Sequence, residues 1–239
     1  ELNRTDYGAF GHLKTSVRTL DYQLAKTDLT EQYSVLPQVR VKFNTHEKNK
    51  ELKYNFNGEV SIFSHTYDTK ADGTRLSLYP SIEYPFKNPG WELTPKVGLK
   101  HRSYSLSNNT NNSISQTTPI LSLRGKMIFD KMASKNILQT LEPEMFFLYV
   151  PASNQDDIPI FDAGENDLRY NLFSENKFYG EDRLNDARQL TLALSSSMVD
   201  TNNGNEILRA TIGQIFYLDD RSVNLTNSET NRSDSSNIM

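Results

Sequence analysis

Apolar and polar residues alternate along much of the chain with a period of two, which is the period of a β-strand. The stretch from Leu76 to Phe86 and the stretch from Trp91 to Lys100 are two examples. Apolar spacing typical of a helix is not evident. The alternation predicts about ten strands, at residues 7–17, 19–27, 36–46, 51–67, 74–86, 91–106, 119–130, 139–150, 189–199 and 207–218.

Several of these segments reach the roughly 9–11 residues that a tilted strand needs to cross a bilayer. Strands of soluble proteins are more often about 5–6 residues long. No apolar run approaches the roughly 18 residues of a membrane-spanning helix. If this chain lies in a membrane, it therefore crosses as strands.

The connections between the predicted strands are alternately short and long. The short ones fall near residues 47–50, 87–90, 131–138 and 200–206, and the longer ones at 68–73, 107–118 and 151–188. Outer-membrane barrels have this asymmetry, with short periplasmic turns and longer surface loops. We therefore expect an all-β fold, an antiparallel transmembrane β-barrel of which residues 1–218 form a partial wall. The stretch 151–188 is then a long surface loop, and residues 219–239 are a polar loop or a disordered tail.

The two faces of the predicted strands differ in polarity. In a membrane barrel the apolar face meets lipid and the polar face meets a water-filled lumen. Alternation alone does not distinguish a lumen from bulk solvent, but strand length and the loop asymmetry favour a lumen. The candidate lumen-facing residues are Arg40, Lys42, Glu83, Lys96, Lys100, Arg124, Lys126, Glu142 and Glu144.

Composition supports an ordered chain with much of its polar surface in water. Only 36% of the residues are hydrophobic, which is low for a soluble domain with a large core, yet 12 Tyr and 12 Phe argue against disorder. Aromatics lie near predicted strand ends, among them Trp91 and Phe86 at one end and Tyr104 and Tyr149 at the other, as in the aromatic belts of membrane proteins. With 26 Lys+Arg against 30 Asp+Glu and no basic block, the sequence does not indicate a nucleic-acid partner.

Candidate chemistry is sparse. There is no cysteine, and the four histidines lack metal-ligand spacing. No G-x-S-x-G turn is present. Glu142 and Glu144 lie about 7 Å apart on one strand face, a separation compatible with a glycosidase pair, but two lumen-facing acids in water are the favoured interpretation. Acidic residues of the 151–188 stretch lack the calcium-loop pattern. We expect no catalytic residue, no metal site and no cofactor.

Several segments together resemble the LPS-assembly protein family (LptD). The most extended is Thr140-Leu141-Glu142-Pro143 with Phe147-Leu148-Tyr149-Val150-Pro151, which continues through residues 154–159, 161–162, 176–183 and 186–190. Shorter ones are Thr74-Arg75-Leu76-Ser77-Leu78-Tyr79-Pro80-Ser81-Ile82, Gly125-Lys126-Met127-Ile128-Phe129 and Ile212-Gly213-Gln214-Ile215-Phe216-Tyr217. They follow the family order across roughly residues 36–220, although Tyr79 and Arg188 depart from the family's usual Glu and Asn. The surface-loop candidates that the resemblance marks are Asn154, Gln155, Asp156, Asp157, Asp162, Gly180, Asp182 and Arg183.

The resemblance implies a very large barrel in the outer membrane of a Gram-negative bacterium, a non-enzymatic translocon that inserts lipopolysaccharide into the outer leaflet. It implies a plug lipoprotein of the LptE type as a partner. It also implies contact with periplasmic lipopolysaccharide-transport proteins, through a domain that this chain lacks, so the chain is expected to be an excerpt. Three alternatives stay open: a general outer-membrane porin or channel, an outer-membrane hydrolase, and a soluble β-sandwich binding module.

Overall fold

The computed structural model describes residues 1–21, 32–45, 52–65, 70–107, 111–166, 172–225 and 232–239. Within these ranges the fold is all-β and antiparallel, as the alternation predicts. No helix in the described part of the chain is long and apolar enough to cross a membrane.

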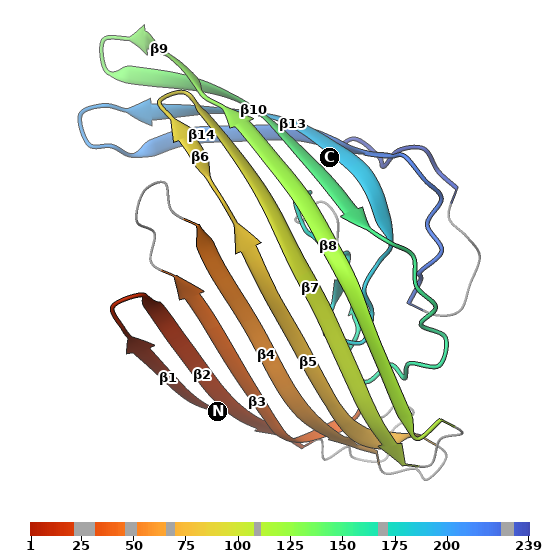
Figure 1. The fold of residues 1–239 in the computed structure, drawn as a ribbon. Helices are drawn as coiled ribbons and strands as arrows, with labels where there is room; N and C mark the ends of the chain where they lie inside the picture. Colours follow the sequence, from red (N-terminus) through yellow and green to blue (C-terminus); the bar gives the residue numbers. More distant parts are fainter. Residues whose placement is uncertain (22–31, 46–51, 66–69, 108–110, 167–171, 226–231) are drawn as a thin grey trace, which may run out of the picture.

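Ten strands pair one after another in chain order, each antiparallel to the next (Figure 1). They are β1 (Leu2–Tyr7), β2 (Gly11–Leu20), β3 (Ser34–Thr45), β4 (Lys53–Ser64), β5 (Asp72–Glu83), β7 (Trp91–Ser107), β8 (Ser113–Met127), β10 (Ile137–Val150), β13 (Ala187–Asp200) and β14 (Glu206–Tyr217). Two short strands extend the sheet locally, since β6 (Phe86–Asn88) pairs with β7 and β9 (Phe129–Ser134) pairs with β10. A separate two-stranded sheet joins β11 (Gly164–Glu165) and β12 (Phe178–Tyr179).

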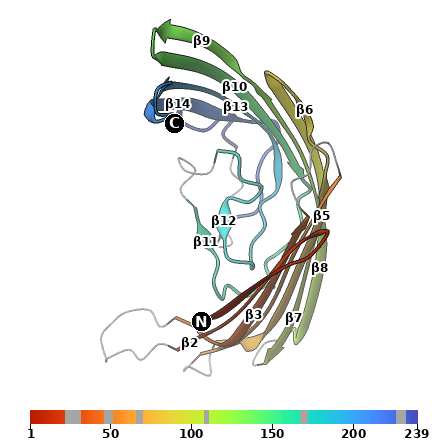
Figure 2. The same cartoon turned by 90° about the vertical axis from the view of Figure 1, so that its left-hand side faces the viewer.

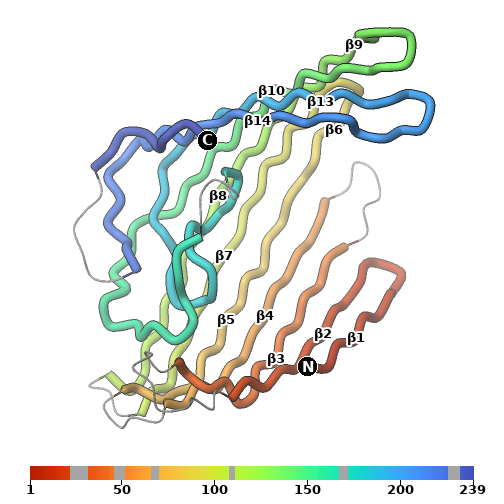
Figure 3. The backbone as a smooth tube through the Cα atoms, turned by 180° about the vertical axis from the view of Figure 1, so that it is seen from behind, coloured from red at the N-terminus to blue at the C-terminus, as the bar shows by residue number. Residues whose placement is uncertain are grey.

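The large sheet is strongly curved and open. Strands β1 and β14 are its ends, and the order of pairing does not close it into a barrel. β10 and β13 are joined by a stretch whose described parts are residues 151–166 and 172–186, which we call the long loop. These residues do not project away from the sheet (Figure 2). Figures 2 and 3 show the long loop, with β11 and β12, on the concave side of the sheet.

Because side chains alternate across a strand, the apolar positions gather on the convex face. Val60 is opposite Leu76 and Val97 is opposite Leu121, so apolar rows continue from strand to strand. Many of these side chains are exposed, among them Val17, Val60, Ile62, Ile82, Val97, Leu99, Leu121, Leu141, Leu192, Leu194 and Ile212. A contiguous exposed apolar face of this kind marks contact with an apolar partner or a membrane.

The predicted strands 7–17 and 19–27 are wrong in their boundaries. The structure has a hairpin, in which Leu2 pairs with Val17 and Tyr7 pairs with His12, with its turn at residues 8–10. That turn falls inside the first predicted strand, because Ala9 and Phe10, which lie between Gly8 and Gly11, are not typical turn residues. Residues 22–27 of the second predicted strand lie outside the described residues.

The predicted polar loop 107–118 is also too long. β8 begins at Ser113, and Ser113–Thr118 pair in register with Ser105–Lys100 of β7. These residues form a strand although they are polar, because their inward side chains meet polar groups of the long loop: Gln116 donates to the carbonyl of Asn154 at 2.9 Å. Near the opposite end of the sheet, the predicted strands 74–86 and 119–130 are each broken, at residues 84–85 and 128.

The aromatic residues near strand ends differ in solvent exposure. Trp91, Phe86 and Tyr149 are exposed, which fits an interfacial position. Tyr104 is 1% exposed and lies in a core cluster beneath the long loop. Assigning Tyr104 to an aromatic belt was therefore wrong, because its side chain points to the concave face.

The last described residues run beside β14. Met239 and Gly213 exchange two backbone hydrogen bonds of 3.0 Å each, and Ser235 bridges to Phe216. Ser236 donates its amide to the carbonyl of Ile215 at 2.8 Å. Residues 234–239 therefore extend the antiparallel pairing of the sheet past β14.

Candidate functional site

The polar residues of the strands gather on the concave face, where the long loop packs. Arg75 of β5 is the most buried charged side chain of this face, with 0% exposure. Its Nη1 lies 2.6 Å from Oδ1 of Asp162 and 2.5 Å from Oδ1 of Asp182, both in the long loop. Its Nη2 lies 2.6 Å from Oε1 of Glu59 on the neighbouring strand β4. The guanidinium group of Arg75 thus binds two carboxylates of the long loop and one carboxylate of the sheet.

Asp182 fixes the backbone of the long loop as well as its attachment. Its Oδ2 accepts the backbone N–H groups of Phe161 at 2.7 Å and of Asp162 at 2.8 Å. Tyr104 donates its hydroxyl to the other oxygen at 3.2 Å. Burial alone would raise the pKa of Asp162, but the hydrogen bonds and charge of Arg75 outweigh it and hold that pKa below its ordinary value.

Gly180 allows this close approach. Its φ is +75°, in the left-handed region that glycine adopts without strain. A Cβ at this position would lie 2.5 Å from the carbonyl oxygen of Asp162. A larger residue would therefore push the loop away from its own carboxylate.

A second set of contacts involves the predicted loop residues Gln155 and Arg183, both buried. Arg102 of β7 donates to Oε1 of Gln155 at 3.1 Å and to the carbonyl of Asp182 at 2.8 Å. Gln155 in turn donates to the carbonyl of Leu184 at 2.7 Å. Arg183 donates to the carbonyl of Ile158 at 2.9 Å. The remaining predicted loop residues, Asn154, Asp156 and Asp157, are exposed.

Apolar contacts hold the long loop at the same end of the sheet. Phe161 stacks on Phe63 of β4 with ring centroids 4.3 Å apart and an interplanar angle of 6°. Ile158 joins the same buried cluster, and Leu184 packs in a second one with Leu148. The long loop is therefore a packed layer on the concave face.

Carboxylates of the long loop also pair with the predicted lysines of β7. Lys96 lies 3.1 Å from Glu175, and Lys100 pairs with Glu181. Glu175 further accepts the hydroxyl of Tyr79 at 2.6 Å. Lys96 and Lys100 are thus engaged by the protein's own acids.

The other predicted wall residues pair mainly between strands. Arg124 pairs with Glu144, and Nζ of Lys126 lies 2.6 Å from Glu142. Glu83 lies 3.9 Å from Lys53, and Arg40 lies 2.6 Å from Glu59. Glu142 and Glu144 are each paired with a cation, which favours the interpretation of two wall acids over a glycosidase pair. Lys42 has no ion pair among the described residues and lines a small cavity beside Gly180.

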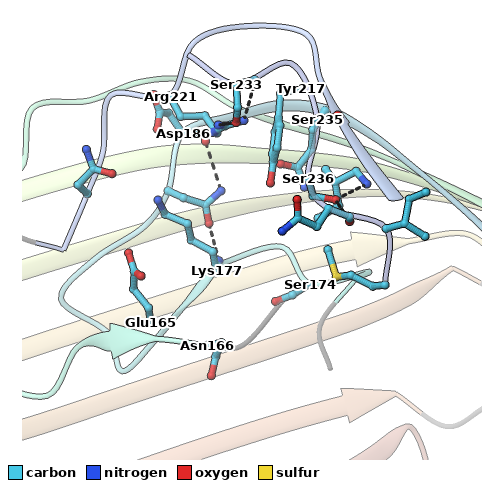
Figure 4. Close-up of a pocket in the computed structure, with 17 residues that line it drawn as sticks. Glu165, Asn166, Ser174, Lys177, Asp186, Tyr217, Arg221, Ser233, Ser235 and Ser236 are labelled. Atoms are coloured by element: carbon cyan, nitrogen blue, oxygen red, sulfur yellow. Dashed lines mark hydrogen bonds between the residues drawn. The ribbon is translucent and has the colours of Figure 1, made fainter. Parts of the chain in front are cut away.

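A larger cavity of about 880 Å³ lies between the long loop and the C-terminal segment (Figure 4). Asp186, the last residue of the long loop, accepts the backbone N–H groups of Ser222 at 2.6 Å and Val223 at 3.0 Å. These hydrogen bonds connect the long loop to the residues that follow β14. Lys177 also lines the cavity, and burial lowers its pKa while Glu165 and Asp186 oppose that effect. Arg221 stacks over Tyr217, with its guanidinium carbon 3.3 Å from the ring centroid.

No group of three or more acidic or histidine side chains in the described part of the chain is arranged to hold a metal. Asp162, a member of the acidic stretch, is instead bound to Arg75. Asp167 lies outside the described residues.

Sequence reasoning missed four residues that organise this face: Glu59, Arg75, Glu175 and Glu181. Arg75 does lie on the polar side of an alternating strand, which was an available signal. Its pairing with Asp162 and Asp182 depends on how a distant loop folds back, which alternation does not encode.

One protein family matches nearly the whole length of this chain. The family model of LptD, described as LPS transport system D, matches residues 2–239. An LPS-assembly protein LptD of Aromatoleum aromaticum is 36% identical over 93% of this chain and 29% of its own length. The protein of the same name from Methylococcus capsulatus is 38% identical over 92% of this chain and 22% of its own length. One from Neisseria meningitidis serogroup B is 35% identical over 96% of this chain and 30% of its own length.

The chain thus spans between about a fifth and a third of the length of these relatives. The match nevertheless includes β1 to β14 and the long loop, whose residues 161–162 and 180–183 carried the resemblance seen in the sequence. The chain belongs to the LptD family of LPS-assembly proteins.

Proposed function

We propose that this chain is part of the wall of an outer-membrane β-barrel whose parent protein inserts lipopolysaccharide into the outer leaflet. The observation that carries the proposal is a curved antiparallel sheet with an exposed apolar convex face and a charged concave face. A membrane barrel needs this arrangement, because lipid surrounds the outside and water fills the inside. The role in lipopolysaccharide insertion is inferred from the relatives, which are named LPS-assembly protein.

The strands are long enough for this role. β7 has 17 residues and β10 has 14, against the roughly 9–11 that a tilted strand needs to cross a bilayer. We assign residues 1–218 to the barrel wall together with its long loop, and residues 219–239 to a polar loop or tail that follows the last strand. The open edge at β1 is then expected to pair with a further strand of the parent protein, since a long unpaired edge invites aggregation.

The long loop covers part of the concave face and narrows the lumen that this face would line. Near one end it contacts β4 through the Phe161 stack, β5 through Arg75, β7 through Arg102, β8 through Gln116 and β10 through Leu148. Beyond it the concave face carries alternating cations and acids, such as Lys126 and Glu142. A polar surface on which many of the cations are paired with acids allows sugars and phosphates to pass, so we propose a translocon and not an enzyme.

Two kinds of partner complete the proposal. A plug lipoprotein of the LptE type would fill the lumen that this wall encloses. Periplasmic lipopolysaccharide-transport proteins would deliver the lipid through a domain outside this chain. Both follow from the family, and the exposed concave surface beside the long loop is where a plug has room to bind.

The test is depletion of the parent protein in its own Gram-negative host, with surface lipopolysaccharide as the readout. Depletion is expected to lower surface lipopolysaccharide, and re-expression of the full-length protein is expected to restore it. A parent lacking residues 151–186 is expected to restore it poorly. Unchanged surface lipopolysaccharide on depletion would contradict the proposal. Steady ion conductance by the purified parent, without an effect on lipopolysaccharide, would support the porin alternative instead.

A further inference from the structure

The concave face of β2 and β3 carries four cations, which we call the β2–β3 basic patch: Lys14, Arg18, Arg40 and Lys42. In the register of these strands Lys14 is opposite Lys42, Ser16 is opposite Arg40 and Arg18 is opposite Gln38. Residues two apart on one strand share a face, and directly paired residues share it across strands. The four cations therefore lie together on one surface.

Charge on this patch is unbalanced, unlike the rest of the concave face. Among the described residues, the carboxylate that pairs with the patch is Glu59, whose Oε2 lies 2.6 Å from Nε of Arg40. Glu59 is shared, because its other oxygen binds the buried Arg75. Elsewhere the predicted wall cations have carboxylates of their own, as Lys96 has Glu175 and Lys126 has Glu142.

Lys14 and Lys42 are a directly opposed pair of like charges. Cβ atoms of such a pair are about 4.5–5.5 Å apart, and like charges in this position destabilise a sheet. Both side chains are exposed, and neither ammonium group has an ion-pair partner among the described residues. Nε of Arg18, in the same patch, is buried without a hydrogen-bond partner in the part of the chain that the structure describes. An anion bound between Lys14 and Lys42 would relieve the repulsion of this pair.

A cavity lies beside the patch, next to Gly180 and Glu181 of the long loop. It has a volume of about 270 Å³, and its lining includes Arg40, Lys42, Asn57 and Lys100. Two carboxylates also line it, Glu59 and Glu181, and each is already neutralised, by Arg40 and Lys100 respectively. The lining thus leaves the Lys42 charge and the Asn57 amide available to a ligand.

We propose that the β2–β3 basic patch and this cavity form a binding site for a phosphate group carried on a saccharide. Phosphate oxygens accept strong charge-assisted hydrogen bonds from ammonium and guanidinium groups. Lys42 and Lys14 hold the phosphate by charge, while Asn57 donates a hydrogen bond from the cavity side. The saccharide as the carrier rests on the proposed function, and inorganic phosphate offers the same chemistry.

The test uses the full-length parent protein, purified with its native partners. The probes are a labelled phosphorylated core oligosaccharide released from lipopolysaccharide, the same oligosaccharide after phosphatase treatment, and inorganic phosphate. The variants are Lys14→Gln, Lys42→Gln and the double variant. The matched control is Lys87→Gln, which removes a lysine charge from exposed β6, far along the chain from the patch.

The double variant is expected to bind the phosphorylated oligosaccharide about tenfold or more weakly, the loss of roughly one charge-assisted contact or more. Each single variant gives part of that loss, and Lys87→Gln binds as the unchanged protein does. The phosphatase-treated oligosaccharide binds weakly and equally to all. Thermal stability of the double variant is equal to or above that of the parent, because a like-charge pair is removed; a merely structural role would lower it.

Binding of the phosphorylated oligosaccharide within about twofold of the parent in the double variant would overturn the site. Inorganic phosphate that binds as tightly as the oligosaccharide, with the same dependence on Lys14 and Lys42, would overturn the saccharide carrier. Surface lipopolysaccharide in depleted cells is measured separately. If it is unchanged while oligosaccharide binding still depends on both lysines, the proposed function fails and the phosphate site stands.

Discussion

Arg75 and Asp182 lie 107 residues apart in the chain and form an ion pair of 2.5 Å in which neither side chain is exposed. Removing two charges from water costs free energy, and their attraction repays it only when the remaining donors and acceptors are satisfied. Here Asp182 also accepts two backbone N–H groups, so the pair fixes both the fold of the long loop and its position on the sheet.

Arg75→Met is expected to release the long loop. It leaves Asp182 buried without its cation, and breaking a buried pair in this way costs about 3–5 kcal/mol. The measurement is hydrogen exchange of the Phe161 and Asp162 amides in the full-length protein, since both donate to Asp182. Arg188→Gln is the control, because its pair with Asp219 is exposed on both sides and such pairs contribute about 0–1 kcal/mol. Equal protection of the two amides in both variants would contradict the role of Arg75.

The aromatic stack makes an independent contribution to the same attachment. Phe161→Ala is expected to lower the free energy of opening of the long loop by about 3–5 kcal/mol, the usual effect of deleting a buried Phe side chain. Protease cleavage within residues 151–186 reports this opening. Tyr179→Ala, at an exposed aromatic of the same loop, is expected to change cleavage little. The idea fails if both variants are cleaved at the same rate.

Gly180 and Gly204 provide a matched pair of substitutions. Both have φ near +75°, so Ala costs about 1–2 kcal/mol at either position from backbone strain alone. At Gly180 a Cβ would also meet the Asp162 carbonyl, whereas Gly204 has open space around it. Gly180→Ala is therefore expected to loosen the long loop in a hydrogen-exchange measurement and Gly204→Ala to leave it closed. Equal effects on the loop would show that the close approach to Asp162 does not matter.

Attachment of the long loop is expected to weaken in acid. Arg75 holds the pKa of Asp162 below its ordinary value near 3.8. A depressed pKa means that the ionised acid contributes fully above the ordinary value, and that this contribution is lost as the pH falls through the lower, folded value. The part of the protease protection that Asp162 contributes should therefore be constant from neutral pH to about 4 and fall below it. Burial raises the pKa of the neighbouring Asp182, so the Asp162 part is measured as the difference between the parent and Asp162→Asn. Asp162→Asn is expected to show lower protection at neutral pH and a shallower fall. The assignment is contradicted if Asp162→Asn leaves the fall in protection below about pH 4 unchanged.

The sequence predicted the strands where alternation is sustained and failed where it is not. Strands β7, β10 and β14 agree with their predicted ranges to within two residues at most ends, because apolar residues recur at every second position. The hairpin of β1 and β2 lies outside its predicted bounds, since Ala9 and Phe10 at the turn give only a weak turn signal. The start of β8 differs from the predicted loop, since its inward side chains contact polar groups of the long loop and are not apolar.

The sequence predicts on which face of the sheet the site residues lie, but it does not predict their ion-pair partners. Period two places Lys96, Lys100 and Arg124 on one side of the sheet, and the structure has them there. Alternation gives no information about Glu175 or Glu181, which reach those lysines from a loop about 80 residues further along the chain. Tertiary contacts between a loop and a strand depend on the whole fold, so local pattern cannot supply them.

The most direct test of the account asks which face of the sheet touches lipid. A fluorescent amino acid is incorporated in the full-length parent at one position, either Val97 or Leu192 on the convex face, or Ser122 on the concave face. The protein is then reconstituted with brominated lipids, which quench a fluorophore on contact. The account predicts strong quenching at Val97 and Leu192 and little at Ser122. Quenching at Ser122, or its absence at both convex positions, would contradict it.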